Sequence, residues 1–417
     1  MENQPKTTKL HGWHISQGAS MTVFHGWEMP LWYPHGAVAE HREVITHAGL
    51  FDTSHMSVLV ATGPGARDLL QRCFTRDLDR PECGIGKCLF GAFLSEQGHA
   101  VDDAVVCQLD PEAFLITVNA GKGGIVTNHL AGYAQDLRVR ISDLTGNVGK
   151  LDLQGPLSGQ ILAKVLEDPE GVLHDMGYYT CKGSFLPEFG SRKVRFAGGI
   201  PVLVSRTGYT GEFGFELFVQ AEALQKVWEI LLEAGSGMGL RTCGLAARDS
   251  LRTGAMLPLS GQDFGPWPFI NHPWHSALPF AEGERGFTKR FVGDQVLDER
   301  DRADYTYAFV GYDPRKVSIH DPAVVLDGQG QEIGTVLTCG VDMGIARHQN
   351  RIYSMASPDK PEDFRPSGLC CGFVKVSGKL ASGRQVELKD KRRSITVLIT
   401  DDIRPSRTAH RSMREMI

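Results

Sequence analysis

Apolar positions in the first third of the chain alternate between helical and strand spacing. Residues 65–72 place Ala66, Leu69 and Leu70 on one face of a helix. Two apolar runs flank the turn-forming residues Ser95–Gly98, which predicts a hairpin. The other elements predicted here are helices at 36–48 and 121–131 and strands at 57–61, 88–94, 104–109 and 114–118. This order predicts an α+β unit with antiparallel pairing.

A second mixed unit follows, and then a β-rich third. The second unit is predicted to contain strands at 151–155, 201–205 and 215–219 and helices at 157–166, 223–234 and 244–254. A loop rich in Pro, Trp, His and Phe is expected at 263–279. Beyond Tyr307 the pattern becomes short strands separated by Gly turns, at 323–326, 332–338, 372–376 and 394–399. This last part predicts a small β-barrel or sandwich.

Composition limits the class of protein. The 417 residues are 41% hydrophobic and 22% charged, as in soluble globular proteins of two or three domains. A net charge of −5 argues against a nucleic-acid coat or a basic membrane-surface protein. No apolar run is long enough for a membrane span, and residues 1–14 lack the apolar core of a signal peptide. We therefore expect a cytoplasmic protein that binds neither nucleic acid nor membrane.

No metal site is predicted from the sequence. Nine cysteines are present without a C-x-x-C motif, and reduced, mostly buried thiols are expected. The pairs His11/His14 and His272/His275 have H-x-x-H spacing without an accompanying Cys or carboxylate in a metal pattern. Phosphate-loop, H-E-x-x-H and EF-hand motifs are absent from the sequence.

The first segment with candidate chemistry is the tandem pair Asp102-Asp103, which leaves a turn and enters an apolar strand. Adjacent side chains of a strand face opposite sides, so at most one carboxylate points into a shared interior site. Burial among Ala and Val would raise the pKa of that carboxyl group and suit it to acid–base catalysis. Two solvated turn acids are an equally good interpretation of this segment alone.

The second is the Gly-rich segment 205–217, in which closely spaced glycines allow the backbone to approach a flat ligand. Tyr209 offers an aromatic face with a polar end. Glu216 lies in a strand, and its carboxylate can accept two parallel N–H bonds from a heterocycle such as an aminopyrimidine. An ordinary hairpin with an edge Glu is equally consistent.

The third is the helix expected at 244–254. Arg248 and Arg252 are i, i+4 neighbours on it, and a carboxylate of the protein or of a ligand is the expected partner of such an arginine. Considered alone, this segment favours Asp249 as the partner of such an arginine.

Taken together, these segments resemble the glycine cleavage T-protein (aminomethyltransferase) family, which includes tetrahydrofolate-dependent demethylases. The matching stretches are Phe24–Leu31, Glu40–Arg42, Gly49–Met56, Gly98–Val106, Val118–Ala120, Leu153–Pro156, Ser205–Glu216, Gly244–Arg252 and Gly261–Asp263. Each motif is weak alone, but their number and order make the resemblance specific over roughly residues 20–265.

The resemblance implies a three-domain cloverleaf around a central channel for tetrahydrofolate, the co-substrate. The implied domains are 1–55 with 147–290, 56–146, and a C-terminal β domain at 300–417. By carry-over, the residues with implied roles are Asp103 as the catalytic acid and Asn119, Tyr209, Glu216 and Arg248 as folate-binding residues. The implied reaction transfers a one-carbon unit to N5 of tetrahydrofolate.

The chain departs from the family pattern on the donor side. Phe90 and Ser260 stand where Tyr is usual, Gly254 stands where Glu is usual, and a rebuilt loop brings His275 near a usual Glu. The aromatic residues proposed to form a donor pocket with that loop are Trp32, Tyr33, Phe90, Trp274 and His275. A loop packed on a domain interface through its aromatic side chains explains the same residues.

Three functions are therefore considered. The rebuilt donor side favours transfer of a methyl or aminomethyl group from a small donor to tetrahydrofolate. An aminomethyltransferase that acts on a lipoyl carrier protein is the second possibility. The third is a non-catalytic folate-binding protein, which the presence of Asp102-Asp103 disfavours.

Overall fold

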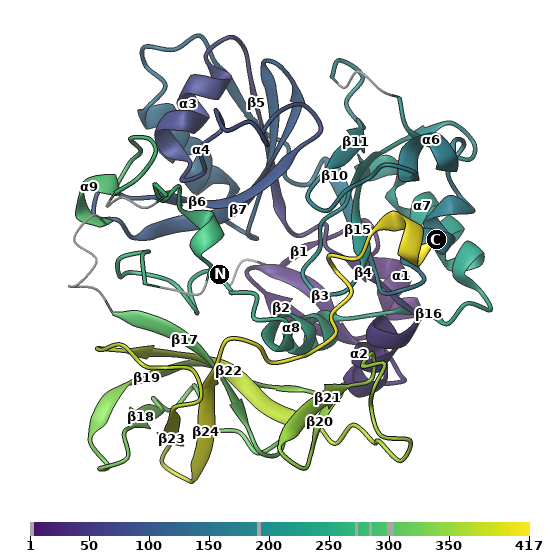
Figure 1. Ribbon diagram of the computed structural model, residues 1–417. Helices are drawn as coiled ribbons and strands as arrows, with labels where there is room; N and C mark the ends of the chain where they lie inside the picture. The colour runs from purple at the N-terminus through teal and green to yellow at the C-terminus, as the bar shows by residue number, and fades with distance from the viewer. Residues whose placement is uncertain (1–3, 190–192, 272–273, 283–285, 298–303) are drawn as a thin grey trace.

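Three lobes meet around a shared centre in the computed structural model (Figure 1), which describes residues 4–189, 193–271, 274–282, 286–297 and 304–417. Each lobe has its own sheet and its own hydrophobic core. The predicted α+β class and cloverleaf arrangement are confirmed. The three main sheets fall within the three expected domains, whose boundaries stay a prediction.

The first lobe contains a six-stranded sheet in the order β11-β14-β15-β10-β4-β16. Its strands are β4 (Ala48–Asp52), β10 (Val148–Gln154), β11 (Cys181–Gly183), β14 (Leu203–Ser205), β15 (Gly214–Gln220) and β16 (Leu240–Thr242). Helices α5 (Ser158–Ala163), α6 (Pro169–Leu173) and α7 (Leu224–Gly235) contribute to its core. On α7, Val227, Trp228 and Leu231 are fully buried, as the helical spacing of apolar positions predicts.

The second lobe is a five-stranded sheet in the order β6-β7-β8-β5-β9. The strands are β5 (Ser57–Thr62), β6 (Cys88–Leu94), β7 (Ala100–Asp110), β8 (Ala113–Val118) and β9 (Arg140–Asp143). Helices α3 (Ala66–Cys73) and α4 (Gly123–Gly132) contribute to its core, α4 through Val126 and Leu130. The predicted hairpin is confirmed: β6 and β7 pair in antiparallel register, and the turn uses Gly98 at φ 71°.

The C-terminal lobe is a closed barrel in the order β17-β22-β19-β18-β23-β24. Its strands are β17 (Tyr305–Gly311), β18 (Val324–Leu326), β19 (Glu332–Asp342), β22 (Leu369–Val376), β23 (Gln385–Lys389) and β24 (Ser394–Thr400). Of the two predicted alternatives, the barrel is therefore the observed one. The segment between β19 and β22 carries the hairpin of β20 (Ile345–His348) and β21 (Arg351–Ser354).

N-terminal elements and one later helix lie between the lobes. The short sheet β1-β3-β2 combines β1 (Lys6–Thr7), β2 (Ser20–Phe24) and β3 (Trp27–Trp32), near α1 (His11–Ser16) and α2 (Ala37–Thr46). Helix α8 (Leu245–Gly254) contacts β3, α2 and barrel strand β19. The remaining elements are β12 (Arg195–Phe196), β13 (Ile200–Pro201), η1 (Ala221–Ala223), η2 (His275–Ala277), α9 (Asp294–Leu297) and α10 (Met413–Met416). Helix α8 thus extends from the first lobe to the barrel.

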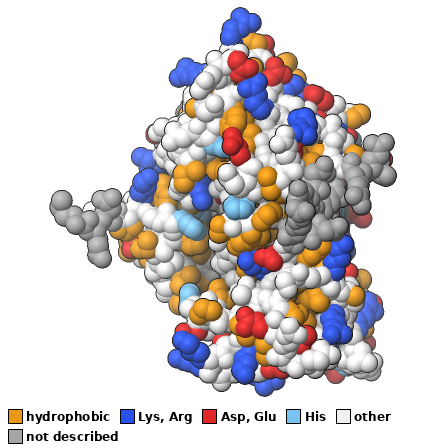
Figure 2. Space-filling view, turned by 90° about the vertical axis from the view of Figure 1, so that its left-hand side faces the viewer, with side chains coloured by type: hydrophobic (Ala, Val, Ile, Leu, Met, Phe, Trp, Pro, Cys, Tyr) orange, Lys and Arg blue, Asp and Glu red, His pale blue; other side chains and the backbone are white. Residues whose placement is uncertain are grey.

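The surface agrees with the modest net charge. On the face shown in Figure 2, Lys and Arg side chains are interspersed with Asp and Glu over the described residues. None of the helices in the described part of the chain is both long and apolar enough to cross a membrane.

Candidate active site

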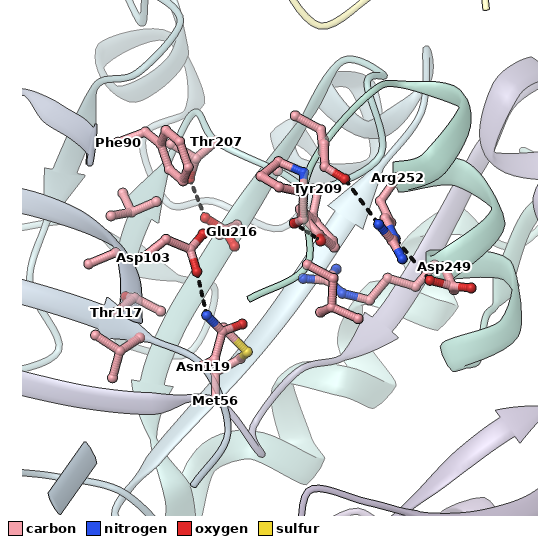
Figure 3. A pocket seen from close by; sticks show the side chains of 18 of the residues that line it. Met56, Phe90, Asp103, Thr117, Asn119, Thr207, Tyr209, Glu216, Asp249 and Arg252 are labelled. Atoms are coloured by element: carbon pink, nitrogen blue, oxygen red, sulfur yellow. Dashed lines mark hydrogen bonds and ion pairs between the residues drawn. The ribbon is translucent and has the colours of Figure 1, made fainter. Parts of the chain in front are cut away.

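A cavity of about 1070 Å³ lies where the three lobes meet. Its lining includes Asp103 of β7, Glu216 of β15, Arg248 of α8 and Val341 of β19, so every lobe contributes. Apolar side chains such as Val105, Met56 and Leu89 make up much of the remaining wall. All five residues with an expected catalytic or folate-binding role line this one cavity. Figure 3 labels Asp103, Asn119, Tyr209 and Glu216 among its lining residues.

The tandem acids differ in environment although they are neighbours in β7. Asp102 is fully buried and accepts hydrogen bonds from the Asn119 backbone N–H at 2.8 Å and from the Ser260 hydroxyl at 2.6 Å. Asp103 faces the cavity and accepts from Asn119 Nδ2 at 2.5 Å. The interpretation as two solvated turn acids is wrong, because Asp102 has no exposed surface.

Asp103 is an unusual carboxyl group. Burial, followed by the nearby Asp102 carboxylate, raises its pKa to about 8. Asn119 opposes this shift because its amide N–H stabilises the charged form. Asp103 is therefore protonated at neutral pH and can donate a proton within the cavity.

Glu216 lies in the cavity wall on β15, and Lys150 of β10 donates a hydrogen bond to its Oε1. Lys150 is almost fully buried and also bonds Asp152 Oδ1 at 2.6 Å. The Thr207 hydroxyl donates to Glu216 Oε2. Both carboxylate oxygens of Glu216 thus have a protein partner, and each keeps a lone pair for a further N–H donor.

Arg248 contacts Asp152 and not Asp249. Its Nη1 lies 2.5 Å from Asp152 Oδ2, and its guanidinium lies 4.9 Å from the centre of the Tyr209 ring. Asp249 instead pairs with Arg252 at 2.9 Å, so Asp249 is the partner of the second arginine of this helix, while Arg248 has a partner from another strand. Consecutive helical residues do not face each other, whereas residues three apart do.

Tyr209 is fixed at its polar end, since its hydroxyl donates to the Pro258 carbonyl oxygen. Burial raises the pKa of this phenol. Its ring lies in the cavity lining beside Arg248, which adds an aromatic surface to the cavity wall.

Two of the residues predicted for a donor pocket line the cavity. These are Phe90 of β6 and Trp274, whose indole N–H donates to the Met256 carbonyl oxygen at 2.7 Å. Trp32 and Tyr33 are not among the residues that line the cavity: Trp32 is 40% exposed, and the Tyr33 hydroxyl bonds His14 Nδ1 at 2.8 Å.

The rebuilt loop also serves to pack the lobes together. Its aromatic residues Phe264 and Phe269 are 2% exposed and form a core cluster with Ala92 and Leu94 of β6. His275 is the first residue of η2, and its side chain, like all of His272, lies outside the described part of the structure. The packing interpretation thus explains most of the loop, while Trp274 also reaches the cavity.

Sequence reasoning missed three residues of the site. Lys150 and Asp152 alternate with apolar residues in a fully buried strand, where charged side chains are rare unless paired. His55 lines the cavity, and its buried Nδ1 has no hydrogen-bond partner among the described residues. Burial lowers the pKa of His55 to about 3. Its place in the stretch Gly49–Met56 was the available signal.

The chain belongs to the GCVT family. Residues 10–267 match the family described as GCVT N-terminal domain. The aminomethyltransferase of Desulforamulus reducens is 34% identical over 358 residues, covering 82% of this chain and 89% of that protein. The aminomethyltransferase of Streptomyces avermitilis is 38% identical over 302 residues, covering 71% and 74%.

A solved relative extends the similarity to the whole fold. The glycine cleavage system aminomethyltransferase T from Bartonella henselae superposes with a TM-score of 0.76 at 25% identity, covering 98% of this chain and 99% of that one. The predicted family is thus confirmed, and so is the class of enzyme, a transferase of the aminomethyltransferase type.

Proposed function

We propose that this protein transfers a one-carbon unit from a small methyl or aminomethyl donor to N5 of tetrahydrofolate. The observation that carries the proposal is the placement of two carboxyl groups in one cavity: Asp103, whose pKa burial raises, and Glu216, which accepts a hydrogen bond from Lys150. Such a pair supplies a proton donor and an anchor for a polar heterocycle within the same space.

The cavity fits a folate. Its volume of about 1070 Å³ exceeds what a small donor alone needs, and ligand pockets are typically about 300–1,000 Å³. The free lone pairs of Glu216 suit the amino and ring N–H groups of a pterin, and Tyr209 offers a ring face. The buried His55 Nδ1, which has no partner within the described part of the chain, can bond a further polar group of the ligand.

When bound, tetrahydrofolate supplies the nucleophilic nitrogen N5. Asp103 then has two tasks in the proposed reaction. Its carboxyl proton passes to the leaving nitrogen, sulfur or oxygen of the donor as the bond to carbon breaks, and its carboxylate afterwards accepts the proton that N5 loses. The Asn119 amide fixes the Asp103 side chain through Nδ2. Proton balance is thereby kept within a single carboxyl group.

The donor is proposed to bind beside Phe90 and Trp274. Both rings line the cavity, and aromatic faces favour a methylated cation or an aromatic methyl ether. The alternative donor is an aminomethyl group on a lipoyl carrier protein, consistent with the relatives named aminomethyltransferase. A small methylated donor would leave 5-methyl-tetrahydrofolate, whereas the lipoyl-linked donor would leave methylene-tetrahydrofolate.

Replacing Glu216 with Ala is expected to abolish micromolar tetrahydrofolate binding. The change removes the pterin anchor, and hydrogen bonds to charged groups contribute about 1.5–3 kcal/mol each, so two such bonds correspond to a loss of roughly 10²–10⁴-fold in affinity. Calorimetric titration under reducing conditions measures this. The matched control is Glu222→Ala, which removes an exposed carboxylate in the same lobe. Equal affinity of wild type and the Glu216 variant would contradict the proposed folate site.

The donor is identified from the folate product. The protein is incubated with tetrahydrofolate and a panel of small N-, S- and O-methyl compounds, or with an aminomethyl-loaded lipoyl carrier protein. Formation of 5-methyl-tetrahydrofolate from a small compound supports the proposal. Methylene-tetrahydrofolate formed only from the carrier identifies the alternative donor, and folate binding without any product would favour a non-catalytic role.

A further inference from the structure

Three cysteines that are distant in sequence meet in the structure. Cys88 and Cys107 face each other across the β6–β7 pair, and Cys181 comes from β11 of the other α+β lobe. Their sulfur atoms all lie within 4.8 Å of one another. The three residues are only 2–5% exposed, so this cluster is a buried group of soft ligand atoms.

Backbone pairing between the lobes holds the cluster together. The Cys88 N–H donates to the Tyr179 carbonyl oxygen at 2.9 Å, and the Cys181 N–H donates to the Gly86 carbonyl oxygen at 2.8 Å. These bonds flank a bridge between Lys87 and Thr180. The sulfur positions are therefore set by the backbone of both lobes.

An oxygen ligand lies beside the sulfurs. Ser205 Oγ is 3.5 Å from Cys88 Sγ and 2.7 Å from Thr207 Oγ1. Because the Thr207 hydroxyl donates its hydrogen bond to Glu216, the bond between Ser205 and Thr207 must be donated by the Ser205 hydroxyl. A lone pair of Ser205 is thus left to face the cysteine cluster.

We propose that Cys88, Cys107 and Cys181 bind one Zn²⁺ ion, with the Ser205 hydroxyl as the oxygen nearest to the fourth position. Thiolates are preferred ligands of this ion, and three protein ligands plus an oxygen is an established tetrahedral arrangement. Three thiolates and Zn²⁺ carry one net negative charge, whereas the same thiolates with Cu⁺ would carry two, which is costlier to bury.

The geometry needs only a small adjustment. With zinc–sulfur bonds of about 2.3 Å, tetrahedral ligation places the sulfurs roughly 3.8 Å apart. Cys88 Sγ and Cys107 Sγ are 2.7 Å apart, so they separate by about 1 Å on binding, within the reach of side-chain rotation. Cys88 also lines the central cavity, which gives the ion a route to the cluster.

The ion would join the two α+β lobes next to the proposed folate site. The Ser205–Thr207–Glu216 chain of hydroxyl bonds leads from the cluster to the cavity carboxylate. The sequence predicted no metal site because the cysteines are 19 and 74 or more residues apart, outside any motif spacing. The test below uses no folate, so its failure would leave the proposed function unaffected.

The first test measures zinc on the full chain. The protein is purified under reducing conditions, stripped with a chelator, incubated with Zn²⁺ and dialysed, and its zinc content is determined by mass spectrometry. We expect about one ion per chain that resists a chromophoric chelator. Alkylation mapped by peptide mass spectrometry should then show zinc-dependent protection of Cys88, Cys107 and Cys181, which decides the matter even if variants fail to fold. Absence of bound zinc, or zinc without protection of these three, would overturn the proposal.

Variants provide the second test. Cys107→Ser and Cys181→Ser are each expected to lose stoichiometric zinc, while Cys83→Ser, which changes a cysteine outside the cluster, keeps it. Circular dichroism establishes that each variant is folded. If the reduced wild type binds no zinc and forms a Cys88–Cys107 disulfide in air, the cluster is a redox pair and the metal proposal is wrong.

Discussion

Asp103→Asn is expected to lower the rate of one-carbon transfer by about 10²–10⁴-fold, the usual contribution of a positioned general acid or base. Asparagine retains the shape of Asp103 and an oxygen for the Asn119 amide, but it has no acidic proton to give. Folate affinity should change little, because Glu216 remains. Single-turnover transfer measured alongside calorimetric titration separates the two effects.

The pH dependence of the wild type gives an independent check. Because the pKa of Asp103 is raised to about 8, its acid form predominates below that pH and is lost above it. If proton donation limits the rate, the rate should therefore fall as pH rises through about 8. The pH profile of Asp103→Asn should lack this decrease. The raised pKa also affects stability. Between the unfolded pKa of about 3.9 and the folded pKa of about 8, the Asp103 carboxyl group is protonated in the folded protein and ionised in the unfolded chain. The free energy of unfolding should therefore decrease as pH rises through that window.

The control for this prediction is Glu112→Gln, which neutralises an exposed acid in the turn that follows the same strand. It should keep both the rate and the pH profile of the wild type. An Asp103→Asn variant with full activity would show that the proton donor is another group.

Much of the candidate site could be predicted because its residues lie in short local patterns. The Asp102-Asp103 pair, the Gly-rich segment before Glu216 and the start of α8 each indicated a polar group held by a regular element. The family resemblance placed them around one channel, and the structure brings their side chains to one cavity. Local pattern and overall fold agree at these positions, as expected for a site built on strands and a helix.

What could not be predicted depends on contacts between distant segments. The partner of Arg248 is Asp152, 96 residues away, although Asp249 is its neighbour in sequence. Tyr33 follows the exposed Trp32 but turns toward His14, since successive residues at a strand end face opposite sides. Gly254 is a similar case: a Cβ there would lie 1.7 Å from Asp342 Oδ2, so the barrel carboxylate, 88 residues away, leaves no room for a side chain at this position.

Arg404→Met is expected to destabilise the protein by about 3–5 kcal/mol, the typical cost of removing one member of a buried ion pair. Arg404 is fully buried, with Nη1 2.6 Å from Asp342 Oδ2 and Nε 3.1 Å from Glu212 Oε1. Without the guanidinium, two carboxylates would remain buried, one from barrel strand β19 and one from the loop before β15. Equilibrium unfolding in urea measures the loss.

The ionisation of the two carboxylates gives the reason for so large an effect. Burial raises the pKa of Asp342, but Arg404 and then His41 lower it overall, to well below its usual range. Burial raises the pKa of Glu212, an effect that Arg404 reduces. In the variant both carboxylates lose their main cation, so the destabilisation should be smaller at acidic pH, where at least one of them can take up a proton.

A matched control distinguishes loss of the ion network from loss of any arginine in the barrel. Arg384→Met changes an exposed arginine near β23 and should alter the free energy of unfolding by less than about 0.5 kcal/mol. An equal effect of the two substitutions would contradict the role given to Arg404. Because Arg404 connects the barrel to the segment that carries Tyr209, we also expect its replacement to weaken folate binding under conditions where the variant is still folded. That loss would show that the barrel shapes the cavity through this network.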